Sequence, residues 1–250
     1  MIGWSRANAS RIGYFAALYK RVTRAIGKAA GDGLFADPAR MQRFDATFAN
    51  RYFAALNGYF YPASNPPPSH CWRVAFEAAE KPSRAIVLHM LTGMNAHIEL
   101  DLGITAWETA KPAPLESLRA DFDTVNAVLA QQVASVLEEI DEISPVLADI
   151  YDLLRKDEIH VIDDALVVFR DRAWNFACVL SAEPAFLDSP VIGIRDLATA
   201  ASGSLILNPP PALAAIVNGI IARESTDVVR NIDELAGIAD QDIVKATADR

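Results

Sequence analysis

Residues 93–101, Gly-Met-Asn-Ala-His-Ile-Glu-Leu-Asp, place polar side chains inside a long apolar run, and this stretch decides how the chain folds. An α-helix turns by about 100° per residue, so Asp101 lies about 40° from His97 and the two side chains share one face. Apolar residues occupy that face and also the opposite one, where Asn95 lies. A helix that is apolar on nearly all sides is typical of the buried centre of a domain.

The burial of these polar groups predicts a site. Burying an unpaired amide or charge costs several kcal/mol, so neighbouring helices, water, a metal or a ligand must satisfy them. His97 and Asp101 stand one above the other on the helix, a spacing that suits two ligands of one metal or a carboxylate that orients an imidazole. A structural hydrogen-bonded pair is the third interpretation of the same spacing.

The rest of the chain follows the same helical period. No segment alternates as a half-buried strand does, and proline-rich loops at residues 61–69 and 208–211 separate the apolar stripes. We therefore predict an all-α fold, a multi-helix bundle around a buried central helix that ends near Thr109. We interpret residues 1–250 as a single helical domain, with a core at 31–184. Residues 185–250, rich in small residues, form a helical extension or a lid.

The composition limits the classes of function. The chain carries a formal net charge of −9 and is 52% hydrophobic and 22% charged, which is typical of a globular protein and gives no support to nucleic-acid binding. No apolar run reaches the length of a membrane span, and the first residues lack the apolar core of a secretory signal. Cys71 and Cys178 are far apart and have no CxxC neighbour. These features predict a cytoplasmic protein with free thiols.

Positive charge gathers near the N-terminus. Residues 1–31 contain six Lys or Arg residues and no acid. Their apolar residues recur at helical spacing, so the segment is a basic amphipathic helix. An ordinary surface helix is the simplest interpretation, and a docking face for an acidic partner or a membrane-surface contact is the alternative.

Side chains from other helices are candidates to complete a site at His97 and Asp101. Asp121, Asn126 and Arg170 lie at the edges of apolar stripes, and we expect at least one of them to share a buried network with the pair. The expected ligand contacts are Asn95, Asp121, Asn126, Arg170 and Trp174. No cofactor is predicted. If a divalent metal is bound, its expected ligands are His97, Asp101 and Asp121.

Several stretches of the sequence resemble one known family. They are Gly-Met-Asn-Ala-His-Ile-x-x-Asp-Leu at residues 93–102, Phe-Ala-Asp-Pro at 35–38, Phe-Ala-Asn-Arg-Tyr-Phe at 48–53, Trp72 with Phe76, and matches within 121–126 and 170–174. Together they resemble an uncharacterised bacterial family of helical proteins known only as a domain of unknown function, over roughly residues 15–182. The resemblance implies an all-helical intracellular protein and carries no activity. Zinc phospholipases are faintly similar in placing an HxxxD on a buried helix, but four histidines are too few for their three-zinc cluster.

We expect an enzyme that processes a small molecule, with His97 as acid/base or metal ligand and Asp101 as its orienting group or co-ligand. The alternatives are a non-catalytic small-molecule-binding protein, a metal-dependent hydrolase, and an interaction protein whose polar core is architectural. The first two require a pocket. We therefore expect a mostly apolar cavity of a few hundred Å³ beside His97, covered by the segment after Pro184. The sequence predicts neither the substrate nor the oligomeric state.

Overall fold

Helices make up all the regular structure of this computed structural model, which describes residues 1–81, 85–125, 127–129, 143–145 and 161–237. No strand is present among these residues, and the all-α prediction is confirmed. In chain order the elements are α1 (Ile2–Ala7), α2 (Ile12–Gly31), α3 (Pro38–Phe60), α4 (His70–Ala79), α5 (Ile86–Ala96), the π-helical turn η1 (His97–Leu102), α6 (Gly103–Ala110), the 3₁₀ turn η2 (Leu115–Leu118), α9 (Val161–Ala182), the 3₁₀ turn η4 (Ala185–Leu187), α10 (Asp188–Leu207) and α11 (Pro211–Ile221). Residues 119–125 and 228–237 are also helical.

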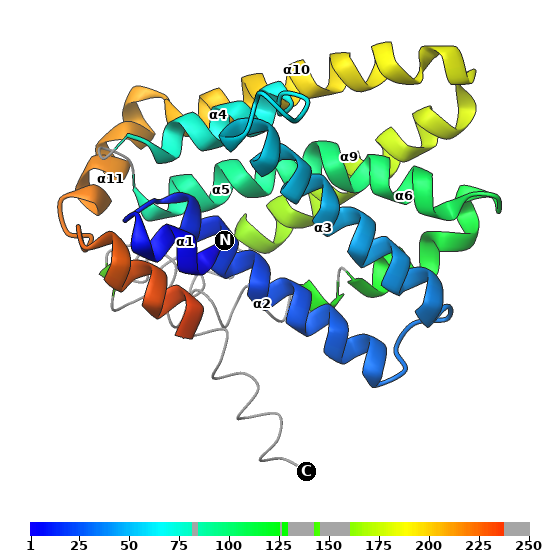
Figure 1. The fold of residues 1–250 in the computed structure, drawn as a ribbon, viewed down its shortest axis with the longest axis horizontal. Coiled ribbons are helices and arrows are strands. Elements are labelled where there is room, and N and C mark those ends of the chain that lie inside the picture. Colours follow the sequence, from blue (N-terminus) through cyan, green and yellow to red (C-terminus); the bar gives the residue numbers. More distant parts are fainter. Residues whose placement is uncertain (82–84, 126, 130–142, 146–160, 238–250) are drawn as a thin grey trace.

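Residues 86–110 form the centre of the bundle (Figure 1). Here α5, η1 and α6 follow one another as a single interrupted helix, and α2, α3, α4, α9 and α10 pack around it. All six residues of η1 are buried. The prediction of a buried central helix is therefore confirmed. It ends at Ala110, just before Lys111, which takes the extended conformation that a following proline favours.

The π-helical turn is a feature that the sequence pattern did not predict. The pattern predicted an unbroken α-helix, whereas residues His97–Leu102 adopt the wider π form, in which hydrogen bonds join residues five apart. The Nε of Arg195 in α10 donates to the Glu99 carbonyl at 2.8 Å, and its Nη2 contacts the Glu99 carboxylate. A side chain that binds a carbonyl in this way competes with the helical hydrogen bonds. Short π turns are frequent at functional sites.

Carboxylates fix the starts of two helices around this centre. The side chain of Asp37 accepts from the backbone N–H of Arg40, and Pro38 follows it in the first turn of α3, as the sequence suggests. The start of α4 has no side-chain cap of its own. Asp196 of α10 supplies one by accepting the N–H groups of His70 and Cys71 at 2.8 and 2.9 Å.

The helix α10 is a packed part of this bundle. It lies along α4 and α5 and buries Asp196, Thr199, Gly203 and Leu207. Residues 188–207 therefore make more packing contacts than a mobile lid would, and the interpretation of residues 185–250 as a helical extension or a lid stays a prediction. Residues 185–207 are long and apolar enough to cross a membrane, judged by length and composition alone. The sequence predicted no apolar run of that length.

Candidate functional site

His97 and Asp101 lie together in the interior, 2% and 3% exposed, as predicted. His97 Nδ1 is 3.1 Å from Asp101 Oδ2. The same oxygen accepts the indole N–H of Trp72 at 2.8 Å, and the other carboxylate oxygen accepts Arg51 Nε at 3.0 Å. Each oxygen of the carboxylate thus has a partner. The network joins η1 to α3 and α4.

The partners of this network are not the ones expected from the sequence. The partners among the described residues are Arg51 and Trp72. Asp121 and Arg170 bind elsewhere, so neither of these two is the expected third member of the network. A signal for Arg51 was available, because it follows Phe48 by three residues and so lies on the buried side of α3. A signal for Trp72 was also available, because a buried indole N–H normally needs an acceptor.

Asp121 belongs to a separate structural contact. Its carboxylate accepts the backbone N–H of Ala36 at 2.6 Å and that of Asp37 at 3.2 Å, and Arg40 lies 3.3 Å away. It therefore holds the loop before α3. In the part of the chain that the structure describes, no three His, Cys, Asp or Glu side chains gather as a metal site would require. The conditional metal set of His97, Asp101 and Asp121 is not assembled.

Three other predicted ligand contacts, Asn95, Arg170 and Trp174, have partners outside the His97–Asp101 network. Arg170 Nη2 donates to the Phe122 carbonyl at 3.4 Å, and burial lowers the pKa of its guanidinium. Trp174 packs on the Phe122 ring with 5.0 Å between centroids. Asn95 donates to the carbonyl of Thr199 in α10 at 2.9 Å. Asn126 lies outside the described residues.

Aromatic rings enclose the imidazole of His97. Phe48 stacks on it with 3.6 Å between centroids and 7° between planes, and Tyr19 meets it edge-on at 4.7 Å. Three further rings lie 5.7–6.2 Å away, those of Trp72, Phe15 and Tyr52. The sequence placed most of these residues on apolar stripes. It gave no indication that the stripes converge on His97.

The surroundings of His97 set its pKa and therefore its protonation state. Burial lowers its pKa and Arg51 acts in the same direction, while the hydrogen bond and charge of Asp101 oppose them. The imidazole is therefore neutral at pH 7. A carboxylate only accepts hydrogen bonds, so Nδ1 carries the proton and Nε2 has the free lone pair. Within the described residues, neither Nε2 nor the buried hydroxyl of Tyr52 has a hydrogen-bond partner.

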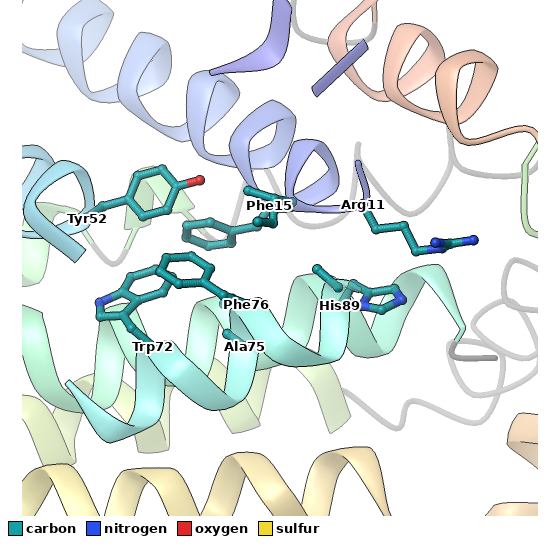
Figure 2. A pocket seen from close by; sticks show the side chains of 10 residues that line it. Arg11, Phe15, Tyr52, Trp72, Ala75, Phe76 and His89 are labelled. Carbon is teal, nitrogen blue, oxygen red and sulfur yellow. The ribbon is translucent and has the colours of Figure 1, made fainter. Parts of the chain in front are cut away.

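A narrow pocket lies beside these rings (Figure 2). Its lining consists of Arg11, Ile12, Phe15, Tyr52, Trp72, Ala75, Phe76, Ala79, His89 and Gly93. The pocket has room for about one water molecule, so among the described residues it does not supply the expected cavity of a few hundred Å³. Phe15, which lines the pocket, packs directly against α5, since a Cβ added at Gly93 would lie 2.5 Å from its ring.

Comparison with known proteins gives one match. The model of a family described as "Family of unknown function" matches residues 1–209, a longer range than the resemblance noted above, and one that includes all of α10. Searches of curated proteins and of solved structures find no match. The chain therefore belongs to this family of unknown function, DUF5995.

Proposed function

We propose that the protein is an enzyme that acts on a small, partly apolar organic molecule, with His97 transferring a proton. One observation carries the proposal. The Nε2 atom of His97 is buried without a hydrogen-bond partner in the described residues, while Nδ1 is bound to Asp101. An unpaired buried nitrogen loses the hydrogen bond it would make in water. A substrate proton or hydroxyl beside Nε2 would restore it.

The pair has the chemistry of an oriented base. Asp101 fixes the ring through Nδ1–H, which leaves the Nε2 lone pair to accept a proton. The imidazolium that then forms lies beside the Asp101 carboxylate, which stabilises it. Arg51 and Trp72 hold the carboxylate in place. In this water-poor aromatic surrounding the charge–charge interaction is stronger than it would be at the surface.

Access to Nε2 requires ring movement, because the rings of Phe48 and Tyr19 pack directly on the imidazole. The hydroxyl of Tyr52, also without a partner among the described residues, belongs to the same ring cluster. It is a donor for a carbonyl or hydroxyl oxygen of the substrate once the rings open. We therefore assign proton transfer to His97 and substrate binding to Tyr52.

A reaction screen in D₂O tests the proposal. Small esters, amides and ketones are incubated with wild type, and NMR detects both hydrolysis and deuterium incorporation. We expect turnover of at least one compound class, and its loss of about 10²-fold or more in His97→Gln. Lys28→Gln, an exposed change on α2, is the control and should keep full activity. Turnover that is equal in wild type and His97→Gln contradicts the proposal, as does the absence of turnover throughout the screen.

Binding without chemistry is the second candidate. The observation in its favour is the small free space of the pocket, together with the stacking of Phe48, which covers one face of His97. A binding protein needs no room for a transition state. Saturable binding by wild type and by His97→Gln, with no turnover by either protein, favours this candidate over the enzyme.

A further inference from the structure

The pocket beside the His97 rings has two chemically different ends. In Figure 2 the side chain of Arg11 extends over His89 at one end, while the rings of Tyr52, Trp72 and Phe76 gather at the other. No acidic residue is part of the lining. A ligand that fits both ends combines an anionic group with an apolar body.

Arg11 is the cation at the polar end. No hydrogen bond or ion pair joins its side chain to the residues that the structure describes, whereas Arg6, the preceding basic residue, pairs with Asp233 at 2.5 Å. Arg11 is also half-buried at the start of α2. A planar guanidinium in such a position matches the two oxygens of a carboxylate. The structure therefore offers a carboxylate-binding group that is not already occupied by an acid of the described chain.

The aromatic end of the pocket favours an apolar ligand body. Phe15, Tyr52 and Trp72 line the pocket and also surround the ring of His97. A flat apolar group packs favourably between such rings. Because the closed pocket has room for about one water molecule, the ligand must be small and must displace side chains, chiefly Phe15.

We infer that the substrate is a small carboxylic acid with an apolar or aromatic body, whose carboxylate binds Arg11 and whose body lies against Phe15 and Trp72. This inference rests on the proposed function, because it places the far end of the ligand at the rings around His97. It adds the substrate class and the residue that recognises it.

Titrations with benzoate and phenylacetate test the inference, and benzamide serves as the neutral match to benzoate. Binding is followed by tryptophan fluorescence and by NMR chemical shifts. We expect wild type to bind both acids and to bind benzamide at least about tenfold more weakly, since a charge-assisted pair is lost. Arg11→Gln should weaken benzoate to the level of benzamide. Lys28→Gln, which removes a charge from the same helix, should leave the Kd unchanged.

Two further variants locate the site. Ala75→Leu and Ala79→Leu each fill the pocket and should abolish binding while circular dichroism still reports a folded protein. Equal affinity for benzoate and benzamide, unchanged binding in Arg11→Gln, or no binding by wild type overturns the inference. Carboxylate binding that follows the expected pattern, with no turnover in the D₂O screen, overturns the enzyme proposal alone.

Discussion

The imidazole of His97 lies nearly parallel to the ring of Phe48, 3.6 Å away between centroids. Phe48 and Arg51 are one helical turn apart on α3, and Arg51 holds Asp101 through its Nε. A single turn of α3 therefore positions both members of the His97–Asp101 pair. Trp72 completes the arrangement from α4. The site depends on how three helices pack, and the first prediction concerns the carboxylate that joins them.

Asp101→Ala should lower the free energy of unfolding by roughly 2–4 kcal/mol. The change removes the acceptor for Trp72 and His97 and leaves Arg51 without its buried partner, which is the costly way to break a buried pair. The Arg51 side chain is 27% exposed, so its charge regains some water and the loss stays below the upper range for such pairs. Urea unfolding measures the difference.

Asp123→Ala is the matched control for this experiment. Asp123 also pairs with an arginine, Arg119, at 2.9 Å, but both side chains are more than a third exposed. Such surface pairs contribute about 0–1 kcal/mol. A loss below about 0.5 kcal/mol for Asp101→Ala would mean that its burial has no energetic consequence, and would remove the basis for treating it as the orienting group.

Stability should fall as the pH drops below about 6.5 because of His97. Burial lowers its pKa in the folded state, with Asp101 opposing and Arg51 reinforcing the shift. Between the folded pKa and the ordinary value the unfolded chain binds more protons, so the stability is present above the ordinary value and is lost as the pH falls. His97→Gln should flatten this slope in urea unfolding between about pH 5 and 7.

Asp196 should make stability depend on pH in a more acidic range than His97 does, and Asp196→Asn tests this. Burial alone would raise the pKa of Asp196, but the backbone N–H groups of Cys71 and His70 and the His70 side chain lower it below its ordinary value. Its contribution is therefore present above about pH 4 and is lost in more acidic solution. A loss of the slope above pH 5 in Asp196→Asn, with none in His97→Gln, would contradict this assignment.

The sequence predicted the parts of the fold that depend on local pattern. The apolar period around His97 predicted a buried central helix, and Asp37-Pro38 predicted the start of α3, because both signals lie within a few residues of what they determine. The partners of Asp101 were missed because Arg51 and Trp72 are 50 and 29 residues away. Which helices meet at Asp101 depends on packing, and a single sequence contains no direct measure of it.

The π turn and Glu99 were missed for a related reason. On an ideal α-helix Glu99 points away from His97, and nothing nearby indicated that it is buried. The structure places it in contact with Arg195 and 3.4 Å from Arg172, on α10 and α9. Arg195, which binds Glu99, lies about a hundred residues further along the chain. Periodicity assumes an ideal helix and cannot report such a contact.

Glu99 and Arg195 should be energetically coupled, because one residue forms the π turn and the other binds both its carbonyl and its carboxylate. A double-mutant cycle with Glu99→Gln and Arg195→Gln should give a coupling energy of about 1–3 kcal/mol in urea unfolding. The exposed pair Arg119–Asp123 serves as the reference and should give about 0.5 kcal/mol or less. A Glu99–Arg195 coupling as small as the reference would show that α10 does not stabilise the turn.

The last prediction concerns the glycine that follows the π turn. A Cβ added at Gly103 would lie 2.7 Å from the carbonyl oxygen of Ala173 and 2.8 Å from the ring of Phe176. The carbonyl belongs to the backbone of α9 and cannot rotate away, so α6 and α9 would have to separate. Overpacking of this kind costs about 1–3 kcal/mol. Gly103→Ala should therefore destabilise the protein, even though alanine is the better helix former.

Gly27→Ala in α2 should change the free energy of unfolding in the opposite direction. Gly27 is exposed, and nothing lies within 4 Å of a Cβ added there. The substitution should stabilise the protein by about 0.5–1 kcal/mol through helix propensity alone. Because both changes replace glycine by alanine inside a helix, the propensity gain is common to them, and the difference between their unfolding free energies isolates the α6–α9 contact. If the two variants had equal stability, α9 would not pack against Gly103 as closely as the structure places it.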